Sequence, residues 1–437
     1  MFLEEKRIKK IVPLLCFLFW LAPGLARSED LYIQIQRGQK LTVALPDFLE
    51  SSPNSKSGTL THDLQSVAEA DLLFTQLFNL NREGPKMELG RINFAEWVKL
   101  GADILLTATV TQKDEKWKKT LEPTVVLVGT VYEVASGKAV FQKAYRTSRR
   151  NSRILPHSFI ADFLFRFTGN RGLSESHIAF INDATGAKEL YLSDYDGANL
   201  RQLTRDQSIT LLPRWSPDGD SVLYTTYFQN NPDLYSYSLS LGKSRSISVH
   251  KGLNTAGSFS PDGKSIVATL SRGQAPNLYL LDLKGKILRR LTSIQAADTS
   301  ASFSPDGRRI VFTSDRPGWP QIYMMDSDGS NVSRLTSSGY CDSPAWSPKG
   351  DKIAFSQGTA KGVHDIVVYD VAEKHSMQIT QNMGRNENPT FSPDGRFLIF
   401  STNRNKKQEL YIAAIDGSSQ RKLGDFPGNS LTPSWGP

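Results

Sequence analysis

The residue types that most often carry out chemistry are scattered through this 437-residue sequence rather than grouped. None of its six histidines has the spacing of a metal site such as H-E-x-x-H, and no G-x-S-x-G segment presents a nucleophilic serine. The sequence also contains no phosphate-binding loop and no dinucleotide fingerprint. We therefore expect a non-catalytic protein that uses neither a metal nor a cofactor.

One acidic segment, D-S-D-G-S-N from Asp326 to Asn331, resembles the start of a calcium-binding loop. The glutamate that completes such a loop is missing further along the chain. Because the segment falls between two expected strands, we predict a hairpin turn here rather than a cation site.

Residues 1–26 have the layout of a secretory signal peptide. A basic flank precedes an apolar run over 11–21, and small residues at Gly24 and Ala26 suit a cleavage site. The alternatives are a retained anchor and a lipid-attachment site at Cys16, but the apolar run is shorter than the roughly 20 residues that span a bilayer. After cleavage only Cys341 remains, which excludes an internal disulfide and predicts a buried free thiol.

The formal net charge of +8 is spread thinly along the chain. No basic stripe interleaved with aromatic residues appears, and an exported protein seldom meets nucleic acid, so we expect no nucleic-acid partner. Beyond residue 26 no apolar run is long enough to cross a membrane.

An internal repeat of 44 residues determines the architecture of the C-terminal part. It is clearest in one near-invariant aromatic position, occupied by Tyr191, Tyr235, Tyr279, Tyr323, Val367 and Tyr411. An aliphatic position keeps the same step, at Leu203, Ile247, Leu291, Leu335, Ile379 and Leu423. Chance does not produce two independent registers of six.

Each repeat reads as four short strands, with an S-P-D-G turn between the first two. The first repeat lacks its inner strand, and the chain ends with an unpaired one from Leu431 to Trp435. If that last strand joins the first repeat, six complete blades close into a ring that leaves few exposed strand edges. We therefore predict a six-bladed β-propeller over 173–437, closed by the C-terminal strand.

Residues 27–168 lack this 44-residue repeat. Their mixture of strand-like and helical patterns predicts a small α/β domain. Helices are expected over 64–80, 92–100 and 158–167, and strands over 31–36, 40–46, 104–111, 125–134 and 139–146.

The loops between the second and third strands differ from blade to blade, whereas the S-P-D-G turns are nearly uniform. Varied loops suggest a surface shaped for a partner. Together with the mouths of the inner strands, these loops give the candidate binding residues Asn254, Asp298, Arg316, Trp319, Asp342, Lys361, Asn386, Glu387 and Arg404. The alternative is that each is an ordinary solvated loop side chain.

A second candidate is the segment over 31–36, called here the N-terminal segment: Leu31, Tyr32, Ile33, Gln34, Ile35 and Gln36. Its apolar and polar side chains alternate, as in a strand. It could be the first strand of its own domain, or it could add a strand to the sheet of a partner.

The chain resembles the TolB family, the periplasmic component of the Tol–Pal system of Gram-negative bacteria. The resemblance covers the whole domain order. Its most telling stretches are ELYLSDYDG (189–197), RWSPDG (214–219), FSPDG at 259 and 303, FTSDRPGWPQIY (312–323) and PSWGP (433–437).

The resemblance implies a monomeric, non-enzymatic periplasmic scaffold that supports outer-membrane integrity and cell division. Its propeller face would bind Pal, the peptidoglycan-associated lipoprotein, and would hold the protein at the outer membrane through that partner. Its N-terminal segment would bind the C-terminal domain of TolA. Leu253 and Ser300 stand where the family often has His and Glu at the Pal-binding mouth. Two alternatives stay open: a propeller that binds a small molecule or glycan in its channel, and a stand-alone relative of the propellers of prolyl oligopeptidase-type peptidases.

Overall fold

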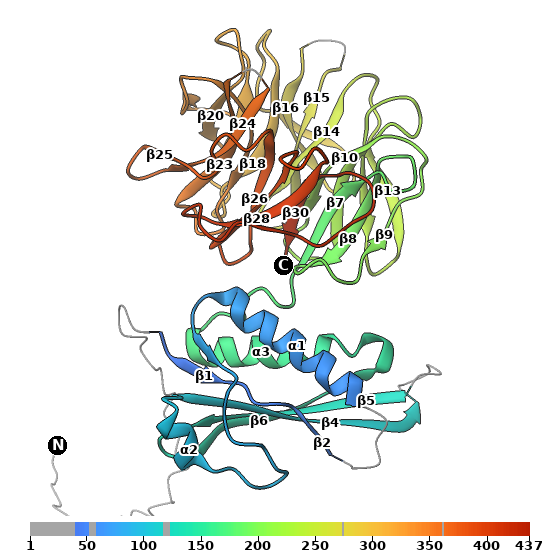
Figure 1. Cartoon of the computed structure of the whole chain (residues 1–437). Coiled ribbons are helices and arrows are strands. Elements are labelled where there is room, and N and C mark those ends of the chain that lie inside the picture. Colours follow the sequence, from blue (N-terminus) through green and yellow to red (C-terminus); the bar gives the residue numbers. More distant parts are fainter. Residues whose placement is uncertain (1–39, 52–57, 117–122, 273–274, 361) are drawn as a thin grey trace, which may run out of the picture.

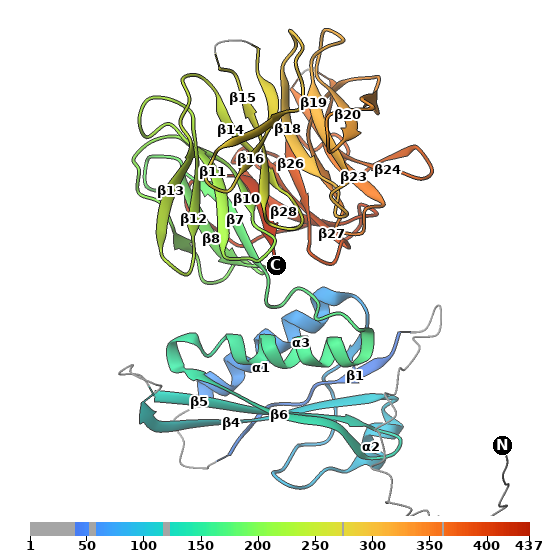
Figure 2. The same cartoon turned by 180° about the vertical axis from the view of Figure 1, so that it is seen from behind.

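A computed structural model describes residues 40–51, 58–116, 123–272, 275–360 and 362–437 (Figure 1). It contains a small α/β domain and, beside it, a β-propeller (Figures 1 and 2). The expected signal peptide, the N-terminal segment and Lys361 lie outside the described residues. Within those residues, no helix combines the length and the apolar character needed to cross a membrane.

The N-terminal domain is one mixed sheet covered on one face by two helices (Figure 1). The strand order is β3-β1-β4-β5-β6, with the short β2 beside β4. Apolar residues on alternate positions of β4 and β5 face helices α1 and α3 and form the core. The elements are β1 (Thr42–Ala44), β2 (Leu49–Glu50), α1 (Gly58–Thr75), β3 (Asn79–Asn81), α2 (Phe94–Lys99), β4 (Ile104–Lys116), β5 (Pro123–Glu133), β6 (Lys138–Ser148), the 3-10 turn η1 (Arg149–Asn151) and α3 (Ile154–Thr168).

The helix expected over 64–80 is wrong at both ends. α1 begins earlier and ends at Thr75, where Gln76 takes a left-handed backbone conformation with φ of 56°. Leu77 and Phe78 continue the helical spacing by coincidence, because the chain has already turned toward strand β3. Phe78 is nevertheless buried, with its ring 5.3 Å from that of Phe163 on α3.

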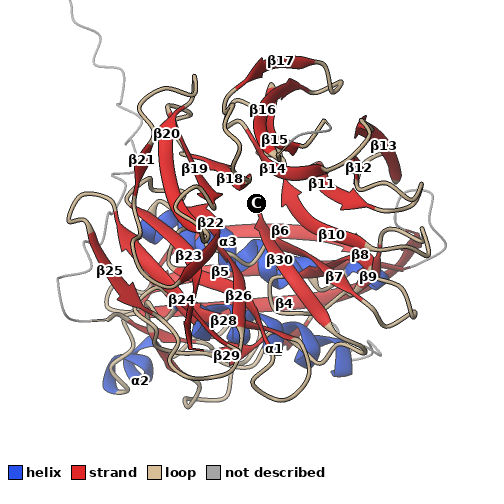
Figure 3. Ribbon diagram, turned by 90° about the horizontal axis from the view of Figure 1, so that it is seen from above, coloured by secondary structure: helices blue, strands red, loops and turns tan. Residues whose placement is uncertain are grey.

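The C-terminal part is a ring of six four-stranded antiparallel sheets around a central channel, which confirms the prediction of six blades (Figure 3). Blade 1 joins β30 (Ser430–Gly436) to β7 (His177–Asn182), β8 (Glu189–Asp194) and β9 (Arg201–Gln202). Blade 2 is β10 (Thr210–Trp215), β11 (Ser221–Thr226), β12 (Asp233–Ser238) and β13 (Lys243–Ser248). Blade 3 is β14 (Asn254–Phe259), β15 (Ser265–Leu270), β16 (Asn277–Asp282) and β17 (Ile287–Arg290). Blade 4 is β18 (Asp298–Phe303), β19 (Arg309–Ser314), β20 (Gln321–Asp326), β21 (Ser333–Arg334). Blade 5 is β22 (Tyr340–Trp346), β23 (Lys352–Ala360), β24 (Val363–Asp370) and β25 (His375–Gln378). Blade 6 is β26 (Asn386–Phe391), β27 (Phe397–Thr402), β28 (Glu409–Ala414) and β29 (Arg421–Lys422).

The ring is closed by the C-terminal strand, as predicted. Strand β30 pairs antiparallel with β7, with Trp435 opposite Ile178. The indole N–H of Trp435 donates to the Ser176 hydroxyl at 2.9 Å, and the Asn182 amide donates to the Ser430 hydroxyl at 3.0 Å. The two ends of the propeller sequence are thus held by both backbone and side-chain bonds.

The S-P-D-G turns are uniform because each turn satisfies its own polar groups. In blade 3 the Ser260 hydroxyl donates to Asp262 at 2.6 Å, and the Asp262 carboxylate also accepts the Lys264 N–H at 3.1 Å. These bonds hold the pKa of Asp262 below its usual value. Blade 5 has Lys349 in place of the aspartate. There the Ser347 hydroxyl donates instead to Asp351, two residues after Lys349, at 2.9 Å.

The acidic segment that begins at Asp326 forms the predicted hairpin turn between β20 and β21. Its carboxylates serve the turn, because Asp326 accepts the Asn331 amide at 2.6 Å and Asp328 accepts the Ser330 N–H at 2.9 Å.

Candidate functional site

The N-terminal domain packs on the side of the propeller that carries the S-P-D-G turns, at blades 1 and 6 (Figure 1). Phe74 at the end of α1 lies 4.7 Å from the ring of Phe397, and Arg396 donates to the Thr75 carbonyl at 2.7 Å. The varied loops between second and third strands are therefore at the opposite, uncovered end of the channel.

Three of the candidate binding residues, Asn254, Asp298 and Asn386, are fully buried. Each is the first residue of an inner strand and its side chain is hydrogen-bonded to a nearby loop; for example, the Asn254 amide donates to the carbonyl of His250, in the connection that leads from blade 2 to blade 3, at 2.6 Å. The sequence places them correctly at the mouths of the inner strands, but their side chains hold loops in position and are closed to direct contact from outside.

Arg316 and Arg404 occupy equivalent places in blades 4 and 6 and support these loops. The guanidinium of Arg316 lies 4.6 Å from the ring centre of Tyr323 and donates to Asp298 at 3.0 Å. That of Arg404 lies 4.2 Å from the ring centre of Tyr411, and burial lowers its pKa. Both guanidinium groups are part-buried rather than free at the surface.

The remaining described candidates lie in blades 4 to 6, and Asp342 and Glu387 are half-buried. Trp319 is 53% exposed in the loop between β19 and β20. Asp342 and Glu387 meet at a cavity of about 380 Å³ at the mouth of blades 5 and 6. Its lining residues are Tyr340, Asp342, Ser343, Ser356, His364, Arg385, Glu387 and Asn388.

Hydrogen bonds order this mouth cavity internally. The Glu387 carboxylate accepts from Arg385 at 2.6 Å and lies 3.0 Å from Nδ1 of His364. Asp342 accepts the Thr313 hydroxyl at 2.8 Å. The result is a rigid polar wall, and Tyr340, at 49% exposure, is open to a partner beside it.

The sequence patterns did not point to Tyr340, His364 or Arg385. A signal existed for two of them, because Tyr340 precedes Asp342 by two residues and Arg385 precedes Glu387 by two, and alternate strand residues share a face. His364 comes from a different strand, β24, and no local pattern pointed to it.

Deeper in the ring, Arg214 on inner strand β10 is close enough to Asp342 to interact electrostatically. Burial lowers the pKa of Arg214 to about 10, and Asp342 opposes that shift. Cys341 is buried as predicted; its thiol donates to the Ser338 carbonyl at 3.3 Å, and burial raises its pKa. Within the described ranges, no group of three or more His, Cys, Asp or Glu side chains is arranged to hold a metal ion.

Two family models match the chain. The model described as the TolB beta propeller domain covers residues 165–437, well over half of the sequence, and the model of the TolB amino-terminal domain covers residues 30–128. The chain belongs to the TolB family. This confirms the resemblance drawn from the S-P-D-G blades and their domain order.

Individual TolB proteins agree with this assignment. A "Protein TolB homolog" of Chlorobaculum tepidum is 34% identical over 233 residues, covering 52% of both chains. A "Tol-Pal system protein TolB" of Desulfosudis oleivorans is 33% identical over 267 residues, covering 58% of both. The chain thus spans little more than half the length of these curated relatives. The crystal structure of TolB from Acinetobacter baumannii matches with a TM-score of 0.75 and 26% identity, over 91% of this chain and 97% of that one.

Proposed function

We propose that this TolB-family chain is a non-catalytic periplasmic scaffold of the Tol–Pal system. It binds the lipoprotein Pal at the uncovered end of the propeller and the C-terminal domain of TolA through residues 31–36. Linking these partners supports outer-membrane integrity and cell division. The membership in the family and the relatives named as Tol-Pal system proteins support this proposal.

The observation that carries the proposal is the asymmetry of the propeller. One end is occupied by the N-terminal domain, whereas the other presents the varied loops, the exposed Trp319 and the mouth cavity beside Tyr340. Exposed aromatic residues beside fixed polar groups are typical of protein–protein binding sites.

Replacing both exposed aromatic residues tests the Pal surface. We expect Trp319→Ala combined with Tyr340→Ala to weaken Pal binding by about tenfold or more, because each removes an aromatic anchor from the interface. Isothermal titration with purified Pal measures the effect. Leu241→Ala is the matched control, since Leu241 is 73% exposed in the turn between β12 and β13, on the side away from the varied loops. Equal affinity of the double variant and the control would contradict this surface.

Deleting residues 31–36 tests the N-terminal segment. We expect binding to the TolA C-terminal domain to be lost, because a strand donated to a partner's sheet supplies most of the main-chain hydrogen bonds of such a complex. Titrating the deleted protein with both partners measures the effect. Undiminished TolA affinity would reject the role of the segment. If the segment also switches between pairing with its own domain and binding TolA, its deletion should change the affinity for Pal, and an unchanged Pal dissociation constant would reject such a switch.

A pull-down from envelope extract separates the scaffold from the channel-ligand alternative. Recovery of a Pal-like lipoprotein supports the scaffold, whereas a bound glycan or small molecule without that lipoprotein supports a channel-binding propeller.

A further inference from the structure

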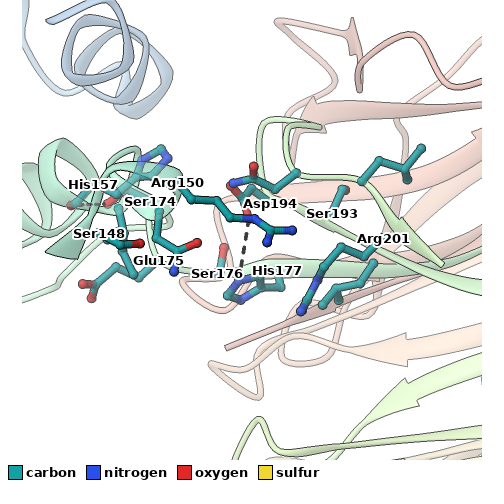
Figure 4. A pocket seen from close by; sticks show the side chains of 15 residues that line it. Ser148, Arg150, His157, Ser174, Glu175, Ser176, His177, Ser193, Asp194 and Arg201 are labelled. Atoms are coloured by element: carbon teal, nitrogen blue, oxygen red, sulfur yellow. Dashed lines mark hydrogen bonds and ion pairs between the residues drawn. The ribbon is translucent and has the colours of Figure 1, made fainter. Parts of the chain in front are cut away.

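Three described histidines lie beside a carboxylate, and one of them belongs to the proposed Pal surface. His157 is buried against Asp71 at the domain junction. His177 lies 3.7 Å from Asp194 in a cavity between the N-terminal domain and blade 1 (Figure 4). His364 lines the mouth cavity at the uncovered end of the propeller. Because an imidazole gains a charge as the pH falls from about 8 to about 5, His364 can change the charge of this surface.

The Nδ1 atom of His364 lies between two neighbours that require different protonation states. Oε1 of Glu387 is 3.0 Å from Nδ1, and Nε of Arg385 is 3.3 Å from the same atom. An ionised carboxylate only accepts hydrogen bonds, whereas a guanidinium only donates them. Nδ1 therefore needs a proton to bond with Glu387, and it must lack one to accept from Arg385.

These requirements define two arrangements of the mouth wall. In the neutral imidazole with its proton on Nε2, Nδ1 accepts from Arg385, which also donates to Glu387 at 2.6 Å and so bridges the two side chains. In the protonated imidazole, Nδ1–H donates to Glu387, and the N–H of Arg385 faces a second cation. That contact is repulsive, and we expect Arg385 to leave it.

Arg385 is also the member of the trio that is free to move. Its side chain is 47% exposed, compared with 18% for His364 and 28% for Glu387. A half-exposed guanidinium gains little from one ion pair in water, so a single repulsive contact is enough to shift its position.

Other ionisable groups around His364 belong to β22 and to its own strand. Burial raises the pKa of Tyr340, so its hydroxyl stays neutral. Asp342 and Asp365 each accept a threonine hydroxyl at 2.8 Å. Of the described groups at this wall, the imidazole is thus the one whose ordinary titration range lies between about pH 5 and pH 8.

Protonation of His364 changes both the charge and the order of the surface beside Tyr340. The ring of Tyr340 lies 6.1 Å from that of His364 and is 49% exposed, so a partner that packs on it also meets this wall. In the neutral arrangement Arg385 is held by two hydrogen bonds before the partner arrives. In the acid arrangement it is mobile, and a docking partner has to order it again, which costs affinity.

We propose that His364 makes Pal binding dependent on pH, with tighter binding when the imidazole is neutral. Arg385 then bridges His364 and Glu387 and presents an ordered wall to the partner. Acid transfers Glu387 to the protonated His364, releases Arg385 and weakens binding. This inference rests on the proposed binding of Pal at this end of the propeller.

Titration of the full chain with purified Pal at about pH 7.5 and about pH 5.5 tests the proposal. We expect binding to be about threefold weaker in acid, which is the effect of ordering one long side chain. His364→Gln, whose amide is neutral at both pH values, should remove this difference, and so should Arg385→Gln, which lacks the released cation. His177→Gln is the matched control, because it removes a histidine beside a carboxylate at the other end of the propeller, and it should keep the difference. Equal affinities at the two pH values, or a difference that persists in His364→Gln, would overturn the proposal.

NMR of the unbound chain with labelled arginine separates this proposal from the binding of Pal itself. The Nε signal of Arg385 is expected to move between the same two pH values in the unmodified chain and to stay constant in His364→Gln. Pal binding accompanied by a constant Arg385 signal would overturn the regulation alone. Absence of Pal binding at both pH values would overturn the proposed function, and the regulation with it.

Discussion

Deleting Ser430–Gly436 is expected to lower the thermal midpoint of the propeller by about 10 °C or more. The deletion removes the inner strand of blade 1 and leaves β7 as an unpaired edge beside the channel. Loss of the buried Trp435 side chain alone costs about 3–5 kcal/mol, and each kcal/mol shifts the midpoint by roughly 2–4 °C in a domain of this size. The lost backbone pairs with β7 add to this.

Calorimetry of the truncated protein measures the effect, with two controls. Deleting Pro437 alone leaves β30 intact and should keep the midpoint within a few degrees. Trp435→Ala, which keeps the strand but removes its largest side chain, should give an intermediate loss. A truncated protein that melts with the same midpoint and cooperativity as the full chain would show that the ring does not depend on this closure.

The propeller could be predicted almost completely because its information is local and repeated six times. Five of the six blades carry an S-P-D-G-type turn and all six keep the same aliphatic position, so a weak signal in one blade is strengthened by the others. The unpaired strand at 431–435 then left one way to close the ring. The N-terminal domain has no such repetition, which is why the helical spacing through Leu77 and Phe78 extended the expected helix beyond its true end at Thr75.

The candidate site was predicted as a surface rather than as a set of side chains. Sequence position shows that Asn254, Asp298 and Asn386 begin inner strands, but it does not show that neighbouring loops cover them completely. His364 comes close to Glu387 only because β24 and the start of β26 are brought together by blade packing. Such contacts across blades depend on tertiary distances that no spacing along the chain encodes.

The contacts at the junction between the domains could not be predicted from local sequence patterns, for the same reason. Asp71 on α1, His157 on α3 and Tyr195 after β8 are far apart in sequence, yet they form one buried polar cluster. Asp71 is 2% exposed; its carboxylate lies 2.8 Å from Nδ1 of His157 and accepts the Tyr195 hydroxyl at 2.5 Å. Burial raises the pKa of Asp71, and the bonds from His157 and Tyr195 oppose that shift.

Asp71→Ala is expected to weaken the attachment of the N-terminal domain to the propeller by about 1–3 kcal/mol, because the Tyr195 hydroxyl is the propeller group of this cluster that loses its acceptor. Removing the carboxylate leaves a buried imidazole and a buried phenol without their shared acceptor, and the desolvation of such orphaned groups is not recovered. Other contacts cross the same junction and would remain. The Arg421 guanidinium lies 4.2 Å from the ring centre of Phe74, and Arg396 donates to the Thr75 carbonyl.

Limited proteolysis and small-angle scattering measure this attachment directly. We expect faster cleavage between α3 and β7, over residues 169–176, and a larger radius of gyration, while each domain keeps its own secondary structure. Asp63→Ala is the matched control, because Asp63 is an exposed carboxylate on the same helix. Cleavage and scattering that are the same for the Asp71 variant, the control and the unmodified chain would mean that the other contacts of the junction hold the domains together without Asp71.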